Sequence, residues 1–195
     1  MDKEIQTLLD MKTWTIVTRA SVKQAGRKVL PTTWSFRLKR RPDGTAYKYK
    51  ARWCVRGDLQ VYGKDYWQSY SPVCQWSTVH LLLIMSVVHG LHTRQVDYVN
   101  AFAQAKLEKE IYVELPKGYG HNNNEDCVLR LNKSLYGMRD APVHFFNLLK
   151  ANLKSCGFQQ KTYIDPCLFV SKKVICVSWV DDCLWVSYDA KAMMI

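Results

Sequence analysis

The sequence has 195 residues, of which 48% are hydrophobic and 23% are charged, and its formal net charge is +11 at pH 7. This length supports one core or two lobes but not several domains. No apolar run approaches about 18 residues and no charged leader precedes an apolar core, so we expect neither a membrane span nor a signal peptide. Seven cysteines lack a Cys-x-x-Cys pair, and five histidines are scattered. We therefore expect reduced core thiols, no structural zinc site and an intracellular protein.

The positive charge is concentrated in one segment. Residues 19–64 hold 13 basic and two acidic residues, whereas the rest of the chain holds 15 of each. Aromatic residues interleave with these charges, namely Trp34, Phe36, Tyr47, Tyr49 and Trp53. Lys and Arg neutralise phosphates and aromatic rings stack on bases, so the segment favours nucleic-acid binding. The alternative is a solvated strand face, which usually carries compensating acids.

In chain order, the first elements are a helix, a strand and a hairpin. Apolar residues at helical spacing predict a short helix near residues 5–9, and residues 14–17 look like a strand. Alternating residues over 34–38 and 47–55, with a Pro-Asp-Gly turn at 42–44, predict a long hairpin with one aromatic and one cationic face.

The remainder predicts two helices and six strands. Ser77 is positioned to cap a helix that runs to Val88 and ends at Gly90. Pro142 opens a second helix, which Gly157 ends. A polar loop is expected over 118–126. Apolar positions of the second helix are Phe146, Leu149, Leu153 and Cys156. Strands are expected at 92–97, 111–115, 127–131, 167–170, 174–180 and 183–188.

Two adjacent acids, Asp181 and Asp182, interrupt an apolar stretch. Two ionised carboxylates at the tip of a buried hairpin would cost several kcal/mol unless a cation neutralised them. Asp97 lies in a similar setting after Gln95-Val96. Three carboxylates from two strands predict a cradle for two Mg²⁺ ions and phosphoryl transfer. The alternative is an exposed, inert polar turn.

These elements predict an α+β fold with polymerase-like fingers and palm lobes. The strands of Asp97 and the acidic hairpin would pair in an antiparallel palm sheet, with the helices from Ser77 and Pro142 packed behind it. The basic hairpin would project as a second lobe over the metal site. Residues 1–195 would form one fragment, with the fingers hairpin at about 29–58 and the palm core at about 77–195.

Short motifs occur in order from end to end. They are Lys12-Thr13-Trp14, Trp34-Ser35-Phe36, Asp43-Gly44-Thr45, Tyr49-Lys50-Ala51-Arg52, Tyr62-Gly63-Lys64-Asp65-Tyr66, Ser71-Pro72-Val73, Asn100-Ala101-Phe102, Ser134-Leu135-Tyr136-Gly137, Ala141-Pro142 and Val180-Asp181-Asp182. A lone Val-Asp-Asp is weak evidence, but in this joint order the chain resembles the reverse transcriptase domain of copia-type LTR retrotransposons, a fragment of a Pol polyprotein.

The resemblance implies roles for particular residues. Asp97, Asp181, Asp182 and the Tyr98 backbone carbonyl would bind two Mg²⁺ ions, with Mn²⁺ as an alternative, for two-metal nucleotidyl transfer. Val180 and Trp179 would contact the primer terminus, although Trp179 stands where the family usually has tyrosine.

The resemblance also implies a nucleotide pocket. Lys50 and Arg52 would grip the triphosphate, and Tyr136 and Gly137 would line the pocket. Phe102 would close against a ribose 2′-hydroxyl and give a deoxynucleotide preference. The alternative for Lys50 and Arg52 is a solvated strand face, and that for Tyr136 and Gly137 is a turn that leads into a helix. The alternative for Phe102 is an aromatic residue of the core. Further departures from the family pattern are Trp67-Gln68, Ala105, Asp140, which adds negative charge near the expected nucleotide path, and Val143.

We therefore expect the RNA-directed DNA polymerase (reverse transcriptase) core of a retrotransposon Pol protein. Its partners would be an RNA template, a DNA primer, deoxynucleoside triphosphates and, in a longer product, thumb, ribonuclease H and integrase segments. Because the chain stops soon after the acidic hairpin, we expect a truncated protein with the thumb missing.

The alternative is a catalytically inactive or domesticated relic that binds nucleic acid. Another palm-fold nucleotidyltransferase or cyclase would not share the Trp34 and Tyr136 motifs. The expected location is the cytoplasm, in a retrotransposon particle, or the nucleus, without membrane association or secretion.

Overall fold

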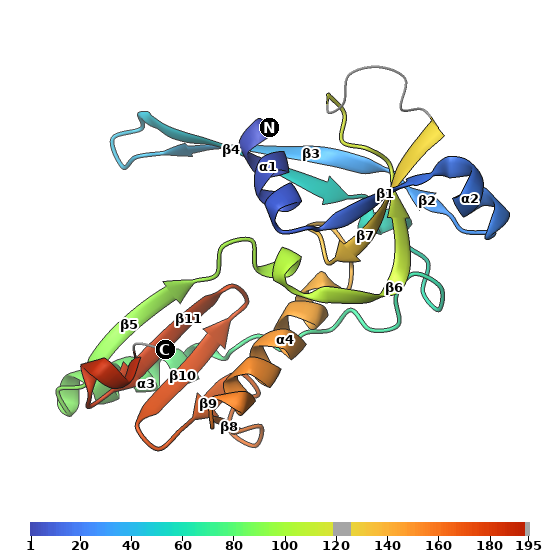
Figure 1. The fold of residues 1–195 in the computed structure, drawn as a ribbon. Coiled ribbons are helices and arrows are strands. Elements are labelled where there is room, and N and C mark those ends of the chain that lie inside the picture. The colour runs from blue at the N-terminus through green and yellow to red at the C-terminus, as the bar shows by residue number, and fades with distance from the viewer. Residues whose placement is uncertain (119–125, 194–195) are drawn as a thin grey trace. The chain divides into compact units, whose positions relative to one another are not determined.

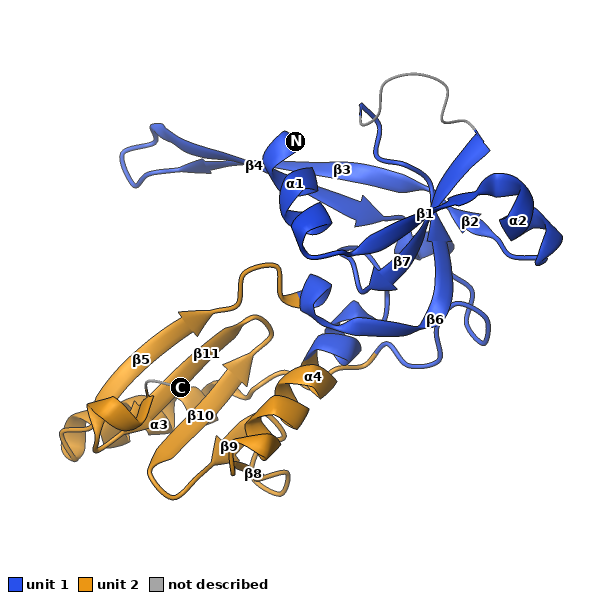
Figure 2. Ribbon diagram, in the orientation of Figure 1, with its two compact units in different colours: residues 1–69, 102–145 blue, residues 70–101, 146–195 orange. Residues whose placement is uncertain are grey.

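The computed structural model describes residues 1–118 and 126–193, and the expected polar loop therefore lies almost wholly outside the described residues (Figure 1). The chain forms two compact units (Figure 2). Unit 1 comprises residues 1–69 and 102–145, and unit 2 comprises residues 70–101 and 146–195. Helices and strands occur in both units, which confirms the predicted α+β class. The assignment of fingers and palm lobes stays a prediction.

Unit 1 is built on a four-stranded sheet. Its strands, in spatial order, are β1 (Trp14–Thr18), β7 (Cys127–Lys133), β6 (Lys106–Val113) and β2 (Val29–Leu30). The β2–β6 pair is parallel and the other pairs are antiparallel. The predicted opening helix is α1 (Asp2–Asp10), which buries Ile5 and Leu8. Their burial adds apolar area to a core in which Trp53 meets Trp14 edge to face at 5.1 Å.

The predicted basic hairpin is confirmed. It consists of β3 (Thr32–Arg40) and β4 (Ala46–Val55), paired antiparallel as a separate two-stranded sheet. The six-residue helix α2 (Arg19–Gln24) was not predicted, because only Val22 is buried on it and no apolar periodicity marks it. A hydrogen bond from the Ser21 amide to the Thr18 hydroxyl starts this helix.

Unit 2 is built on a five-stranded antiparallel sheet. Its strands, in spatial order, are β5 (His92–Asp97), β11 (Asp182–Ser187), β10 (Val174–Trp179), β9 (Leu168–Val170) and β8 (Gln159–Gln160). The predicted pairing of the Asp97 strand with the acidic hairpin is therefore confirmed.

Among the described residues, short 3₁₀ helices lie at η1 (Gly57–Leu59), η2 (Ala101–Gln104) and η4 (Ala190–Met193).

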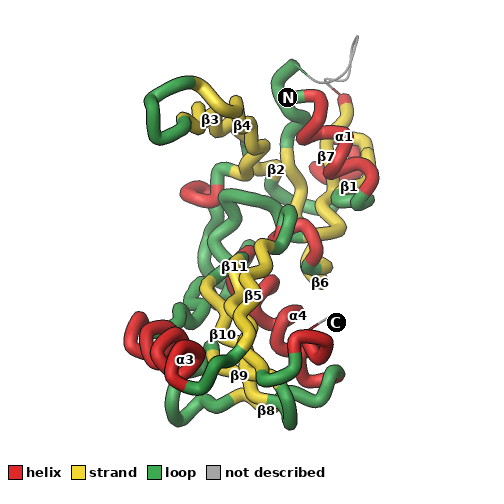
Figure 3. The backbone as a smooth tube through the Cα atoms, turned by 90° about the vertical axis from the view of Figure 1, so that its left-hand side faces the viewer, coloured by secondary structure: helices red, strands yellow, loops and turns green. Residues whose placement is uncertain are grey.

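Two helices flank the unit 2 sheet on opposite sides. They are α3 (Trp76–Val88) and the unit 2 part of α4 (Ala141–Ser155), as Figures 1 and 3 show. The expectation that both pack behind the sheet is wrong. The central strands are apolar on both faces: Val177 joins the cluster that contains Leu82 of α3, whereas Trp185 on the other face packs on Phe158, after α4. A sheet that is apolar on both faces needs a cover on each.

The start of α3 differs from the prediction. The Ser77 hydroxyl donates to the Gln75 side chain at 3.4 Å and caps nothing. The buried carboxylate of Asp165 instead accepts hydrogen bonds from the Gln75 amide at 2.8 Å and the Thr78 hydroxyl at 2.7 Å. The helix ends as predicted at Gly90, whose φ is +62°.

The cysteines agree only in part with the expectation of core thiols. All seven are free, and four are buried, namely Cys74, Cys167, Cys176 and Cys183. Cys156, which was expected on the apolar side of α4, is exposed. Within residues 1–118 and 126–193, none of the helices has the length and apolar character needed to cross a membrane.

Candidate active site

The backbone brings the three predicted acidic positions together in unit 2. Asp97 and Asp182 lie directly opposite each other on β5 and β11. Opposite residues of an antiparallel pair point to the same face of the sheet. Asp181 occupies the adjoining turn, where its backbone oxygen accepts a hydrogen bond from the Tyr98 amide at 2.9 Å. Two strands and one turn therefore place three acids at one end of the sheet.

The side chains of these acids are not buried as expected. Asp97 is exposed, and Asp181 and Asp182 are half-buried. The Asp182 carboxylate accepts a hydrogen bond from the Gln95 side chain at 3.3 Å. The part of the chain that the structure describes holds no group of three His, Cys, Asp or Glu side chains that could bind a metal. The expectation that these carboxylates are buried is therefore wrong, whereas metal binding by the three acids stays a prediction.

The donor chemistry nevertheless suits a hard divalent cation. Carboxylate and backbone oxygens are the ligands that Mg²⁺ takes in proteins. The strand register fixes the backbone of Asp97 opposite that of Asp182. Both side chains would therefore reach a shared metal ion by rotating about their side-chain bonds.

The acidic turn contains a strained residue. Val180 has a φ of +54°, and it is the first of two residues between the paired Trp179 and Asp182. A positive φ at the first loop position suits a two-residue hairpin turn, but that position favours glycine. A β-branched residue there stores about 1 to 3 kcal/mol of strain.

We expect Val180→Asn to stabilise the protein by about 1 kcal/mol, because asparagine tolerates positive φ. Val73→Asn is the matched control, since Val73 has a similar exposure in unit 2 and is not among the residues with positive φ. Urea unfolding of both variants measures the difference. An unchanged or lower stability of Val180→Asn relative to this control would show that the turn is unstrained.

Trp179 and Tyr98 support the acidic turn. The Trp179 ring packs on Trp76 of α3 with ring centroids 4.7 Å apart. Burial raises the pKa of Tyr98 to about 12. Primer contact by Trp179 and Val180 and metal binding by the Tyr98 carbonyl stay predictions.

Three of the predicted nucleotide-pocket residues form one cluster in unit 1. The Arg52 guanidinium carbon lies 4.7 Å from the centre of the Tyr136 ring. The Phe102 ring meets the same ring edge to face at 5.1 Å. A cation over an aromatic face is stabilised by the ring quadrupole, so Tyr136 fixes the position of the Arg52 charge. Lys50 lies two residues before Arg52, on the same face of β4.

Gly137 is needed for a close approach of two backbone segments. Its φ is +86°, and an added β-carbon would overlap the Val55 carbonyl oxygen. A β-carbon at Gly57 would overlap the Gly137 carbonyl oxygen in turn. The Val55 amide also donates to the Tyr136 carbonyl at 2.8 Å. Gly137 therefore permits a close approach to the end of β4, and its place in a nucleotide pocket stays a prediction.

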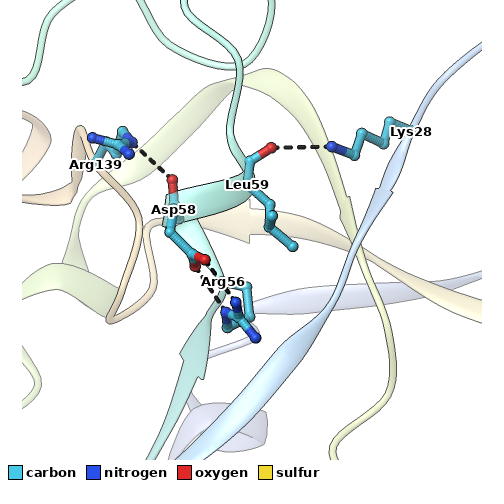
Figure 4. Close-up of polar contacts among 6 residues, drawn as sticks. Lys28, Arg56, Asp58, Leu59 and Arg139 are labelled. Atoms are coloured by element: carbon cyan, nitrogen blue, oxygen red, sulfur yellow. Dashed lines mark hydrogen bonds and ion pairs between the residues drawn. The ribbon is translucent and has the colours of Figure 1, made fainter.

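Arg139 ties the same two segments together and was missed by the sequence reasoning. Its side chain donates to the Gly57 carbonyl at 2.9 Å, and its amide donates to the Gln60 side chain at 2.8 Å. Figure 4 shows Arg139 beside the Asp58 segment, with the Arg56–Asp58 ion pair next to it. In the sequence Arg139 is one of many basic residues, so no local signal distinguishes it.

The remaining polar contact in Figure 4 holds the η1 turn from its other side. The Lys28 side chain donates to the Leu59 carbonyl at 3.0 Å. Lys28 therefore helps to position the turn that follows the basic hairpin.

The basic hairpin has the two predicted faces. Arg37 pairs with Lys50, Lys39 pairs with Lys48, and Arg52 lies on the same face. The other face carries the stacked rings of Trp34 and Phe36 together with Tyr49. Like charges directly opposite each other are destabilising. A polyanion along this face would relieve that repulsion.

Asp140 does not add charge to an exposed path. It is 2% exposed, and its carboxylate lies 3.5 Å from the His144 ring and 3.8 Å from the Lys109 ammonium. Burial raises the pKa of Asp140 and lowers the pKa of His144. His144 also shares a 2.8 Å hydrogen bond with the Ser134 hydroxyl. Asp140 thus lies buried beside the partly buried side chains of His144 and Lys109.

The chain belongs to a polymerase family. The family described as reverse transcriptase (RNA-dependent DNA polymerase) matches residues 11–194.

Its relatives are Pol polyproteins of copia-type transposons, which confirms the resemblance drawn from the motifs. The chain is 32% identical over 194 residues to the retrovirus-related Pol polyprotein from transposon TNT 1-94 of Nicotiana tabacum, covering 97% of this chain and 14% of that protein. It is 31% identical to the RE2 polyprotein of Arabidopsis thaliana, covering 97% of this chain and 13% of that protein. It is also 31% identical to the Ty1-ER2 Gag-Pol polyprotein of Saccharomyces cerevisiae, covering 97% of this chain and 10% of that protein. The chain thus corresponds to a small part of each relative.

Proposed function

We propose that the chain is the nucleotidyl-transferring region of a retrotransposon reverse transcriptase, which adds deoxynucleotides to a DNA primer on an RNA template. The register that sets Asp97 opposite Asp182, with Asp181 in the adjoining turn, carries this proposal. Family membership supports the class of reaction. Use of an RNA template follows from that membership rather than from the geometry.

Backbone hydrogen bonding positions each of the three acids. Asp97 and Asp182 are held by strand pairing, and Asp181 is held by the hydrogen bond from the Tyr98 amide. These three carboxylates and the Tyr98 carbonyl would hold two Mg²⁺ ions, for which Mn²⁺ would substitute. When bound, the ions would neutralise phosphate charge and favour the ionised primer hydroxyl.

The unit 1 residues act on the triphosphate and the sugar. Arg52, held over the Tyr136 ring, presents a guanidinium to phosphate oxygens, and Lys50 adds a second positive charge on the same face. Phe102, held against Tyr136, provides the bulk that would exclude a ribose 2′-hydroxyl.

The chain spans only 10% to 14% of the named relatives. We propose that it works within a longer Pol product that contains thumb, ribonuclease H and integrase segments, in a cytoplasmic particle. The basic hairpin would contribute to template binding through phosphate contacts.

The test is extension of an oligo(dT) primer on poly(rA) with dTTP and Mg²⁺. We expect extension by the unmodified chain, and no extension above background by Asp181→Asn, because amide substitution removes one of the three negative charges. Asp189→Asn is the control, since Asp189 is exposed in the same unit and is not one of the predicted ligands. Equal extension by the unmodified chain and Asp181→Asn would refute the catalytic proposal.

A second candidate is a non-catalytic protein that binds nucleic acid. Two observations favour this candidate. The side chains of the three acids do not form a ready-made metal-binding group among the described residues, and the hairpin has a cationic face. Salt-dependent binding of single-stranded RNA, without extension in Mg²⁺ or Mn²⁺, would support this candidate. Extension that requires Asp181 would exclude it.

A further inference from the structure

Helix α3 carries large apolar residues on every side, yet only one side of it is buried. Thr78, Leu82 and Ser86 are buried on that side. Six large apolar side chains elsewhere on the helix are exposed by 43% to 84%, namely Trp76, Leu81, Leu83, Ile84, Val87 and Val88. Because a helix that is apolar all round is normally buried all round, the exposed side of α3 lacks a cover.

The exposed residues form one continuous surface. With 3.6 residues per turn, residues 76, 80, 83 and 87 form one row along the helix, and residues 77, 81, 84 and 88 form the neighbouring row. Ser77 and His80 are the polar members of these rows. The two rows lie opposite the side that holds Leu82. We call these six side chains the α3 patch. In Figure 3, α3 flanks one side of the unit 2 sheet.

The α3 patch is large for a monomer. Its exposed fractions correspond to roughly 700 Å² of surface, whereas the largest apolar patch of a typical monomer is about 300 to 600 Å². Two such patches in contact would bury at most about 1,400 Å², which lies within the standard range for specific protein interfaces. The area is thus sufficient for a stable contact.

The composition of α3 identifies the chemistry of its partner. Helix α3 contains no Asp, Glu, Lys or Arg. A charged partner surface would lose hydration without gaining a counter-charge. A membrane-surface helix usually carries basic residues on its polar side, and α3 has none. The patch therefore fits an apolar, uncharged helix.

A second copy of α3 meets this requirement. Unit 2 contains seven basic and five acidic residues, so it has little net charge, whereas residues 19–64 account for the +11 of the chain. Contact between two copies of unit 2 therefore costs little electrostatic repulsion. We propose that two copies of this chain associate through α3 packed against α3, in a two-fold symmetric contact.

The contact would adjoin the candidate active site. Trp76 lies at the N-terminal end of the patch, and its ring packs on Trp179. Only Val180 separates Trp179 from Asp181 along the chain. Association would therefore bury an aromatic pair that supports the acidic turn.

Sedimentation velocity of the nuclease-treated chain, from micromolar to about 100 µM, tests the proposal. We expect a dimer for the unmodified chain, and for Ile84→Glu a dissociation constant that is raised about 30-fold or more. Glutamate forms helices well, so circular dichroism should show Ile84→Glu folded. Ile164→Glu is the matched control, because Ile164 is similarly exposed in unit 2 but lies outside α3, and it should remain a dimer.

The dimer should also persist at 1 M salt, because the patch is uncharged, whereas association through nucleic acid bound to the basic segment would be lost. A monomeric unmodified chain at all concentrations would overturn the proposal, and would leave another protein segment as the cover of the patch. Equal association by the unmodified chain and Ile84→Glu would overturn it as well.

Discussion

Replacement of Asp165 by asparagine is expected to destabilise unit 2 by about 3 kcal/mol or more. One carboxylate oxygen accepts hydrogen bonds from the Gln75 amide, the Thr78 hydroxyl and the Cys74 thiol, and the other accepts from the Cys167 amide at 2.8 Å. Asparagine retains one acceptor oxygen and turns an NH₂ group toward donors. Buried donors then lose their acceptor, and the start of α3 is no longer attached to the segment before β9.

The same interactions make this contribution dependent on pH. Burial alone would raise the pKa of Asp165, but the hydrogen bonds from Gln75, Cys167, Thr78 and Cys74 outweigh burial and lower the pKa below its usual value. A lowered folded-state pKa gives stability that is present above the unfolded-state pKa of about 4 and is lost as the pH falls through the folded-state pKa. The unmodified chain should therefore lose stability below about pH 4 more steeply than Asp165→Asn.

Urea unfolding between pH 3 and pH 7, followed by hydrogen exchange of the unit 2 amides, measures both effects. Asp189→Asn is the control, because Asp189 is exposed in unit 2 and its ion pair with Lys173, at 3.8 Å, should contribute little. If Asp165→Asn unfolded at the same urea concentration as Asp189→Asn, Asp165 would not be needed to hold the start of α3.

Local patterns predicted most of the strands and helices. The basic hairpin was predicted because alternation over β3 and β4 and a Pro-Asp-Gly turn act over short distances, and the register confirms its two faces. Helix α4 was predicted because Pro142 and Gly157 mark its ends. The pairing of β5 with β11 followed from the palm layout, since the acids had to meet.

Features that depend on distant residues were not predictable. Asp165 binds the start of α3 from 90 residues away along the chain, whereas the local sequence points to Ser77. The sides taken by α3 and α4 depend on a sheet that is apolar on both faces, which a linear pattern does not assign. The half-exposed state of Asp181 also depends on its place at the sheet edge, which its apolar neighbours conceal.

Gly137→Ala is expected to destabilise unit 1 by about 3 kcal/mol or more. Alanine would pay about 1 to 2 kcal/mol for the left-handed backbone, at a φ of +86°. Its β-carbon would also overlap the Val55 carbonyl oxygen, so the backbone segments would have to separate. That separation would weaken the hydrogen bond from the Val55 amide to the Tyr136 carbonyl.

Two further glycines in unit 1 separate these contributions. Gly44 has a φ of +84° with no atom within 4 Å of an added β-carbon, so Gly44→Ala should show the backbone cost alone. Gly57 is not among the positive-φ glycines, but its β-carbon would overlap the Gly137 carbonyl oxygen, so Gly57→Ala should show the overlap alone. Urea unfolding with hydrogen exchange of the unit 1 amides should therefore rank Gly137→Ala as the least stable variant. Equal losses for Gly137→Ala and Gly44→Ala would mean that the Val55 segment moves away freely, and that Gly137 is required only for its backbone angle.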